Sequence, residues 1–371
     1  MNDLSEFPAG LRLRTLHVDL GRSWRGGQHQ AYLLACGLRD RGHEAEVFTA
    51  GDSPLACRVR DAGIPIRATA AGASRLRAAW DLRRLLRRCW YDVIHCHDAH
   101  GLAAAWLARA HRRASVVAAR RVAYPLSRGV AGLSRYHSAR CIVAVSKFVR
   151  ESVLACGIAP GKVAVVFDGV EAPPPVSTRD RLEARRELGL VAGTPLVGCV
   201  GYLLPEKGQD RLIRALPLII RRHPGCRLLL AGDGPCRRSL GRLADALGVQ
   251  DSVLFLGHVE DVSRVYRALD VFLFPSLAEP LGSSLLAAMA HGLAAVAISK
   301  GAVPEIIADQ SNGLLADEPE PAQIAAAALR LLDDHALAAR LGAAARVTVE
   351  QRFTASGMVD ATLALYRKIK S

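Results

Sequence analysis

The segment VFLFPSLAEPLGSSLLAAMAHG, residues 271–292, indicates the fold of this chain more clearly than any other stretch. A short apolar strand leads into a turn with a lone acid, Glu279, and a Gly-Ser-Ser tripeptide then opens a helix rich in Ala and Leu. The first turn of a helix carries unpaired N–H groups and the positive end of the helix dipole, so it can bind an anion, while the carboxylate beside it can hold hydroxyls. A phosphate next to a polyol is typical of a nucleotide sugar. An ordinary strand–turn–helix unit with a Ser N-cap explains the segment equally well, so the rest of the chain must distinguish the two.

Apolar runs of strand length continue on both sides of this segment and alternate with helical patterns. In the second half they lie at residues 195–203, 226–234, 253–259, 294–299 and 313–316, with a helix predicted over 209–222. In the first half they lie at residues 13–20, 44–50, 93–97, 115–119 and 141–146, with a helix predicted over 30–40. Short apolar strands between helices are typical of parallel sheets that are covered on both faces. We therefore predict an α/β protein with two doubly wound, Rossmann-like domains.

A proline-rich break, APPPVST at residues 172–178, separates the two series of strands. The predicted domains are an N-terminal domain over 1–172, a linker and helix over 173–189, and a C-terminal domain over 190–350. The last helical stretch, 351–371, is a candidate to pack back on the first domain. Ligands of doubly wound sheets bind beyond the carboxyl ends of the strands, so we expect a site in a cleft where two such sheets face each other.

The composition and the distribution of the cysteines indicate the cellular compartment of the protein. No apolar run reaches the ~18–20 residues that a membrane span needs, and the N-terminus lacks the basic and apolar regions of a secretory signal. The nine cysteines are scattered, and Cys96, Cys141 and Cys199 fall in apolar runs. This pattern favours reduced core cysteines over disulfides or zinc ligands. We therefore expect a cytoplasmic protein.

The net charge of +14 is concentrated in the first half of the chain. Residues 1–175 hold 26 Lys and Arg against 14 Asp and Glu, and the remainder holds 23 against 21. A basic face indicates an anionic partner, such as lipid headgroups or a phosphorylated acceptor, and plain solubilising charge is the alternative. The basic residues lack interleaved aromatics and no recognition module is visible, so we do not expect nucleic acid as a partner.

The stretch SRLRAAWDLRRLLRRCW, residues 74–90, predicts an amphipathic helix. At about 100° per residue, its apolar side chains, Leu76 and Trp80 among them, fall mostly on one broad side, and arginines crowd the other. The helix either packs on the sheet with its Arg face in water or lies against anionic lipid. Because it must also cover the sheet, we favour packing with a peripheral attraction to the inner face of the cytoplasmic membrane.

Several segments occur in the order in which a known family carries them. They are GGQHQAYLLACGLRDRGHEAEVFT (26–49), YDVIHCHDAHG (91–101), AVSKFVRESV (144–153), VGYLLPEKGQDRLIRA (200–215), LLLAGDGP (228–235), EPLGSSLLAAMAHG (279–292) and VPEIIADQSNGLLA (303–316). Through them the chain resembles the retaining glycosyltransferases of family four, whose fold is called GT-B. The resemblance implies transfer of a sugar, with retention, from a nucleotide-sugar donor to a glycan or lipid-linked acceptor in cell-envelope polysaccharide or lipopolysaccharide synthesis. It also implies that the reaction uses no metal and no further cofactor.

The resemblance places the nucleotide-sugar donor on the second domain. Lys207 is expected to stabilise the diphosphate leaving group, whose negative charge grows during the reaction. The helix start at Gly282, Ser283 and Ser284 is expected to bind the same diphosphate. Glu279 is expected to hold hydroxyls of the donor sugar. A surface lysine beside a helix start is the alternative interpretation of Lys207.

Two positions in the second domain depart from the family's pattern. Tyr202 stands where an Arg usually assists Lys207, and it can donate a hydrogen bond but brings no charge. Ala287 stands where the second acid of the family's Glu-x7-Glu motif is expected to bind the ribose, so nucleotide binding should be weaker or altered. Glu305 lies in the loop that faces the nucleotide, and an acid at a helix N-terminus explains it almost as well.

The first domain offers two further pairs of candidates near the donor or acceptor. Gly26 and Gly27 allow the backbone to approach a ligand at a strand–helix junction, with a tight turn as the alternative. Arg120 and Arg121 occupy the place near the transferred sugar where family members often carry a His. Two guanidiniums there can clamp a phosphate or carboxylate, and a solvated loop is the alternative. We expect Arg121 and Gly27 to lie near the reacting centre.

A cluster of polar side chains, His95, His97, Asp98 and His100, follows a strand of the first domain. The residue types could hold a metal, since two of them alternate along the strand and a third follows. No further ligand is evident, so a hydrogen-bonded lining on the acceptor side is the favoured interpretation and we expect no metal.

Two other functional classes remain open at this point. An epimerase of nucleotide sugars can use the same architecture, with Asp98 and His97 as its acid and base. A degenerate homologue that binds a nucleotide sugar without turning it over would account for Ala287 and Tyr202.

Overall fold

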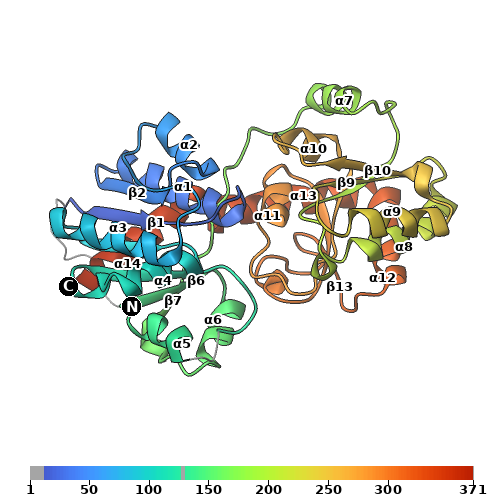
Figure 1. Cartoon of the computed structure of the whole chain (residues 1–371). Coiled ribbons are helices and arrows are strands. Elements are labelled where there is room, and N and C mark those ends of the chain that lie inside the picture. The colour runs from blue at the N-terminus through green and yellow to red at the C-terminus, as the bar shows by residue number, and fades with distance from the viewer. Residues whose placement is uncertain (1–11, 127–129, 371) are drawn as a thin grey trace. The chain divides into compact units, whose positions relative to one another are not determined.

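The computed structural model of the chain describes residues 12–126 and 130–370 and divides into two compact units (Figure 1). The first unit comprises the chain up to Val145, Val149–Phe167 and the segment from Ala355 onward. The second comprises Ser146–Phe148 and Asp168–Thr354, so it includes the proline-rich stretch. Among the described residues, no helix has both the length and the apolar character needed to cross a membrane.

The first unit is built on a seven-stranded sheet with the order β3-β2-β1-β4-β5-β6-β7, in which every pair is parallel. Its strands are β1 (Arg14–Val18), β2 (Glu44–Ala50), β3 (Ile66–Thr69), β4 (Val93–Cys96), β5 (Ser115–Arg120), β6 (Cys141–Ala144) and β7 (Val163–Val165). The five strands predicted from apolar runs are present. The two additional strands, β3 and β7, are edge strands of only four and three residues; β3 alternates apolar and polar residues, whereas β7 lies in an apolar run that the sequence analysis did not count.

Helices cover this first sheet and complete its core. They are α1 (Gly26–Asp40), α2 (Pro54–Asp61), α3 (Arg75–Arg88), α4 (Ala99–Leu107), α5 (Val130–His137), α6 (Lys147–Leu154) and α14 (Ala355–Lys370). One apolar core joins α1 and α2 to the C-terminal helix α14 and to the strands. Within it Val359, Leu363 and Tyr366 of α14 are buried, and Arg41 pairs with Asp360 at 2.6 Å. The C-terminal helix therefore packs on the first unit.

The second unit contains a six-stranded parallel sheet with the order β10-β9-β8-β11-β12-β13. Its strands are β8 (Leu196–Val200), β9 (Arg227–Ala231), β10 (Val253–Gly257), β11 (Val271–Phe274), β12 (Ala294–Ile298) and β13 (Leu314–Ala316). All six coincide with predicted apolar runs. The central strands β11 and β12 are buried along their whole length and need a continuous apolar sequence, and the edge strand β10 is apolar although most of it is only half-buried.

Seven α-helices accompany this second sheet in the described part of the chain. They are α7 (Thr178–Glu187), α8 (Gln209–Arg222), α9 (Arg237–Ala246), α10 (Ser263–Ala268), α11 (Ser283–Ala290), α12 (Pro321–Asp333) and α13 (His335–Arg352). The charged helix α7 begins with a capping box between Ser177 and Asp180. Its buried Arg185 pairs with Asp270 at 2.7 Å, which ties the linker helix to the second unit.

Each sheet has one point at which the strand order reverses. In the first unit this point lies between β1 and β4, and in the second it lies between β8 and β11. The loops that leave adjacent strands there turn to opposite faces of the sheet, and the crevice between them is where doubly wound proteins bind ligands. Each of the two switch points is therefore a candidate position for a functional site.

Candidate functional site

At the switch point of the second unit, Lys207 and Glu279 form an ion pair. Lys207 Nζ lies 2.6 Å from Glu279 Oε2, and their side chains are 29% and 9% exposed. Lys207 follows β8 in a short 3-10 helix, Pro205–Lys207, and Glu279 follows β11. The structure thus brings together two predicted site residues that the sequence analysis treated separately.

The loops that carry this pair pack tightly on each other. Gly208 has a φ of +71°, and a Cβ built on it would lie 2.4 Å from the carbonyl oxygen of Pro275. The N–H of Leu277 donates to the carbonyl oxygen of Glu206 at 3.0 Å. Because only glycine allows this close approach of two backbones, Gly208 holds Lys207 beside the loop of Glu279.

The backbone of Glu279 is fixed from a third direction by the loop after β12. Ala302 N–H donates to the carbonyl oxygen of Glu279 at 2.9 Å. Gly301 has a φ of +63°, and a Cβ there would lie 2.5 Å from the same oxygen. The loop after β12 therefore fixes the backbone of Glu279, and the loop after β8 supplies the ammonium that pairs with its carboxylate.

The N-terminus of α11 lies beside Glu279. Gly282 is the N-cap with a φ of +109°, and a Cβ on it would lie 3.5 Å from Glu279 Cγ. The N-cap is thus a glycine and not the serine of the alternative, an ordinary strand–turn–helix unit, and no side chain of the described residues caps the helix. The N–H groups of its first turn, at Ser283 and Ser284, therefore remain available to an anion.

At the switch point of the first unit, the buried Asp19 follows β1 and the half-buried Asp98 follows β4. Asp19 accepts hydrogen bonds from both Gln28 Nε2 and the N–H of Gly21. Asp98 accepts from the N–H groups of Leu20, His100 and Gly101, so it caps α4. Burial, followed by the nearby Asp98 charge, raises the pKa of Asp19 to about 6, and burial raises the pKa of Asp98. The sequence analysis placed Asp98 on the acceptor side and missed Asp19.

Three histidines lie beneath these carboxylates in the interior of the first unit. His17 Nδ1 lies 3.0 Å from His97 Nε2, and the His95 and His97 rings stack with centroids 4.3 Å apart. Burial lowers the pKa of His17 to about 3 and lowers the pKa values of His95 and His97 well below their usual range. His95 Nδ1 lies 2.6 Å from the hydroxyl of Tyr366 on the C-terminal helix.

The same three histidines are the group of metal-ligating type that the described residues bring together. Their ligand nitrogens lie within 4.8 Å of one another. Both ring nitrogens of His17 and of His97 already have hydrogen-bond partners, and the partner of His97 Nδ1 is the guanidinium of Arg121 at 3.3 Å. A cation beside a histidine is a poor neighbour for a metal, so this arrangement suits neutral, hydrogen-bonded imidazoles better than a metal centre.

The two adjacent arginines after β5 point to different partners. Arg120 is buried, with its guanidinium donating to the carbonyl oxygen of Tyr124 and lying 3.4 Å from the hydroxyl of Tyr136. Arg121 extends to His97. Successive side chains at a strand end leave on opposite faces, so the pair does not form the two-pronged clamp considered from the sequence, and Arg121 alone joins the histidines.

The remaining predicted residues of the first unit lie at its surface. His100 accepts a hydrogen bond from Arg75 Nε at 3.0 Å and is exposed, so it does not join the buried histidines. Gly26 and Gly27 open α1, whose N-cap Arg25 makes no side-chain cap. A Cβ on Gly27 would meet no atom within 4 Å, so the backbone there is open to a ligand.

Comparison with known proteins identifies the family. The profile described as glycosyl transferases group 1 matches residues 180–348, and the profile described as Glycosyltransferase Family 4 matches residues 24–172. An uncharacterized glycosyltransferase of Methanocaldococcus jannaschii is 31% identical over 365 residues, which cover 90% of this chain and 92% of that protein. The chain belongs to glycosyltransferase family 4.

Other relatives of this glycosyltransferase act on different substrates. A D-inositol 3-phosphate glycosyltransferase of Nocardia farcinica is 30% identical over 359 residues, covering 85% of this chain and 79% of the relative. A GDP-mannose-dependent monoacylated alpha-(1-6)-phosphatidylinositol monomannoside mannosyltransferase of Corynebacterium glutamicum is 33% identical over 189 residues, covering 48% of this chain and 49% of the relative.

Solved structures confirm the GT-B fold of the enzyme. Anabaena HepE, in complex with UDP and glucose, has a TM-score of 0.84 at 22% identity, covering 95% of this chain and 98% of that one. The lipopolysaccharide outer core galactosyltransferase WaaB has a TM-score of 0.70 at 16% identity, covering 95% of this chain and 99% of that one.

The two departures from the family pattern lie at accessible positions of this glycosyltransferase. Tyr202 is 44% exposed after β8. Ala287 lies on α11 one turn beyond Ser283, and both are half-buried. A carboxylate at position 287 would therefore lie on the same helix face as Ser283.

Glu305 lies in the 3-10 helix Val303–Glu305 after β12. Its carboxylate accepts hydrogen bonds from the N–H groups of Lys147 and Phe148, at 2.8 Å each, and these residues group with the second unit. Both carboxylate oxygens are thus engaged at the start of a helix, which agrees with the helix-dipole interpretation of this acid.

Proposed function

We propose that the enzyme transfers a sugar, with retention, from a nucleotide-sugar donor to a glycan or lipid-linked acceptor of the cell envelope. The observation that carries the proposal is the Lys207–Glu279 pair beside the start of α11 at the switch point of the second sheet. In this assignment Glu279 holds hydroxyls of the donor sugar. Lys207 and the N–H groups of Ser283 and Ser284 bind the diphosphate and stabilise its charge as it leaves.

The same residues supply what a divalent metal supplies in other transferases. A helix N-terminus and an ammonium together place positive charge where the leaving diphosphate develops negative charge. We therefore propose that the reaction needs no metal and no cofactor beyond the nucleotide sugar. Retention of activity in a chelator would support this assignment, and strict dependence on an added divalent metal would contradict it.

Helix α3 supports an acceptor at an anionic membrane surface. Its buried side chains are Ala78, Ala79, Leu82 and Leu86. Leu76 and Trp80, predicted to lie on the broad apolar side, are 71% and 52% exposed, because small alanines cover the sheet in their place. The apolar residues of this helix are therefore divided between the core and the surface.

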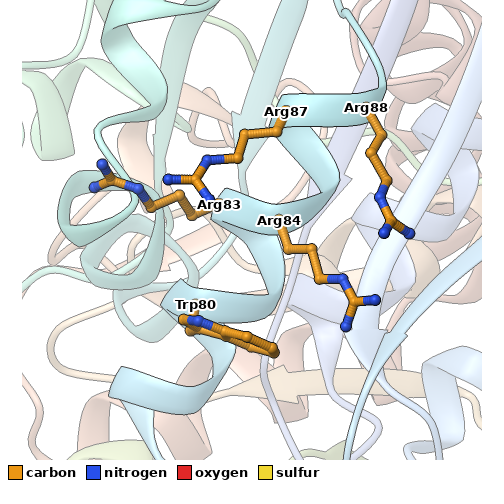
Figure 2. A pocket seen from close by; sticks show the side chains of 5 residues that line it. All are labelled: Trp80, Arg83, Arg84, Arg87 and Arg88. Atoms are coloured by element: carbon orange, nitrogen blue, oxygen red, sulfur yellow. The ribbon is translucent and has the colours of Figure 1, made fainter.

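The exposed Trp80 lies among arginines of the same helix (Figure 2). Together with Arg83, Arg84, Arg87 and Arg88 it lines a cavity of about 360 Å³. An exposed aromatic ring surrounded by guanidiniums matches the boundary between anionic headgroups and acyl chains. We propose that α3 attracts the enzyme to the inner face of the cytoplasmic membrane, where a lipid-linked acceptor is found.

The decisive experiment is incubation with a panel of nucleotide sugars, with and without glycan and lipid-linked acceptors, while nucleotide diphosphate release is measured. Release that depends on an acceptor, with an anomeric configuration unchanged in the product, is the expected result. Interconversion of the sugar without release would favour the epimerase. Binding without turnover of any donor would favour the degenerate homologue, for which Ala287 and Tyr202 are the supporting residues.

A further inference from the structure

A line of hydrogen bonds runs through the interior of the first unit from Arg121 to the start of β2. Arg121 Nη1 lies 3.3 Å from His97 Nδ1, and His97 Nε2 lies 3.0 Å from His17 Nδ1. His17 Nε2 lies 3.1 Å from Thr15 Oγ1, which donates to the carbonyl oxygen of Glu44 at 3.0 Å. Thr15, His17 and His97 are at most 5% exposed. The hydrogen bonds therefore lead from a half-buried arginine to buried side chains.

The two ends of this line determine the direction of every bond in it. A guanidinium has only donors and a carbonyl oxygen only accepts. His97 must therefore accept at Nδ1, carry its proton on Nε2 and donate it to His17. His17 in turn carries its proton on Nε2 and donates it to Thr15, whose own proton goes to the Glu44 carbonyl. Every donor in this arrangement meets an acceptor. If all the bonds ran the other way, Arg121 would have to accept a proton and the Glu44 carbonyl would have to donate one, which neither group can do.

Protonation of either imidazole would break this sequence, because an imidazolium has only donors. A protonated His97 would point an N–H at the N–H of Arg121. Burial disfavours that state, since it lowers the pKa values of His17 and His97 far below neutrality. Both rings are therefore neutral at the pH of the cytoplasm, and each has one tautomer.

The strands of the sheet hold these residues in register. Thr15 and His17 alternate along β1, where His17 pairs with His95 of the adjacent β4. His97 directly follows β4, and Arg121 directly follows β5. Because three neighbouring strands carry the line, its distances are set by the ladder of backbone hydrogen bonds and not by flexible loops.

We propose that Thr15, His17 and His97 are positioning residues that hold the guanidinium of Arg121 in one orientation for an anionic group of the acceptor. The inference rests on the proposed function, because it assigns a role to Arg121 within sugar transfer. The positive charge of Arg121 acts on the carboxyl of Asp19, where it opposes the rise in pKa. A cation held beside a carboxylate fits an acceptor that presents an oxyanion, such as a phosphate, next to a hydroxyl.

The first test reads the tautomers directly and needs no turnover. In ¹⁵N-histidine-labelled enzyme, the nitrogen shifts of His17 and His97 should both report a neutral ring with the proton on Nε2. In Arg121→Gln the shifts of His97 should change, since its acceptor nitrogen loses the guanidinium. A proton on Nδ1 of His97 in the wild-type enzyme would overturn the inference, whether or not sugar transfer is ever observed.

A metal at the three histidines is the competing outcome of the same measurement. His95 Nε2 has no hydrogen-bond partner among the described residues, so it could join His17 and His97 as a ligand. Metal bound through Nε2 of His97 would move its proton to Nδ1, against Arg121. Stoichiometric zinc retained after dialysis with zinc chloride, together with loss of the Nε2–H signals, would therefore overturn the inference.

The second test uses the hydroxyl at the far end of the line, which is separated from Arg121 by two imidazoles. Thr15→Val removes the hydroxyl at nearly constant shape, and Thr15→Ser keeps it. We expect Thr15→Val to raise the acceptor KM about tenfold with the donor KM unchanged, and Thr15→Ser to restore the wild-type value. In an Arg121→Gln background, Thr15→Val should have no further effect on the acceptor KM. Equal kinetics for Thr15→Val and Thr15→Ser, or additive effects in the double variant, would overturn the positioning role even if the tautomers are as expected.

Discussion

The switch points of the two sheets share one topology but differ in their electrostatics. In the second unit a half-buried ammonium and a buried carboxylate meet at 2.6 Å at the sheet's carboxyl edge. In the first unit neutral imidazoles, the buried Asp19 and the half-buried Asp98, both with raised pKa values, occupy the corresponding place. A charged pair beside a helix N-terminus suits a diphosphate, whereas buried acceptors of hydrogen bonds suit hydroxyls. This difference supports the proposal that the leaving group binds the second unit and the acceptor binds the first.

The largest expected effect is loss of the charge at position 279. Glu279→Ala leaves the Lys207 ammonium without its partner and removes the contact to sugar hydroxyls, so kcat/KM should fall about 10²–10³-fold. The rate of nucleotide diphosphate release measures this change in kcat/KM. Glu279→Gln is the matched variant, because it keeps the shape and loses only the charge. Wild-type activity in Glu279→Ala would contradict the proposal that the switch point of the second unit is part of the active site.

Removing the ammonium should have the next largest effect. Lys207→Met keeps most of the side-chain volume and should lower kcat about 10²-fold, because the leaving diphosphate loses one positive charge. Lys207→Arg keeps the charge and should retain most of the activity. If Lys207→Met changes only the thermal stability and not kcat, the ion pair is structural. The electrostatic difference between the two switch points would then not support a leaving-group site in the second unit.

The first unit should respond to pH through Asp19. Burial and the charge of Asp98 raise its pKa in the folded state to about 6, above the value in the unfolded chain. Between about pH 4 and 6 the folded state therefore binds more protons than the unfolded state. The free energy of unfolding consequently falls as the pH rises through that window. Asp19→Asn should therefore raise the free energy of unfolding at pH 8 by about 2–3 kcal/mol, with little change at pH 4. Urea denaturation at the two pH values measures the difference. An equal effect at both would show that Asp19 is not the group that titrates.

The smallest expected effect concerns the surface of the first unit. Arg84→Ala with Arg87→Ala should weaken binding to vesicles of anionic phospholipid about thirtyfold, since each arginine near such a surface contributes about 1 kcal/mol. The matched control, Arg214→Ala with Arg221→Ala, removes two exposed arginines of α8 in the second unit. Sedimentation at two salt concentrations measures the binding. Equal losses in both double variants would mean that net charge, and not α3, attracts the enzyme.

The second unit was predicted more completely than the first. All six of its strands follow from apolar runs, and the central strands among them are apolar because they are buried on both faces. The first unit has the additional edge strands β3 and β7, of four and three residues, which the sequence analysis missed although the apolar residues 163–167 around β7 were a usable signal. Short strands at a sheet edge depend on their neighbour for formation and not on their own composition.

The candidate site residues of the second unit were likewise predicted more completely than those of the first. Lys207 and Glu279 were identified from motifs, yet the 2.6 Å contact between them depends on the packing of Gly208 and Gly301 against distant loops. In the first unit the sequence analysis missed Asp19, although an acid at the end of an apolar strand was a usable signal. It also did not indicate that Arg120 and Arg121 separate or that Tyr366 reaches His95.

The sequence by itself determined the fold class and the family and supplied the candidate donor-side residues, because periodicity and local motifs depend on neighbours in the chain. Only the tertiary structure decided which acids are buried, which histidines are neutral and which arginine joins them. Those properties depend on solvent exclusion and on hydrogen bonds between strands, and both are set by residues that lie far apart in the sequence.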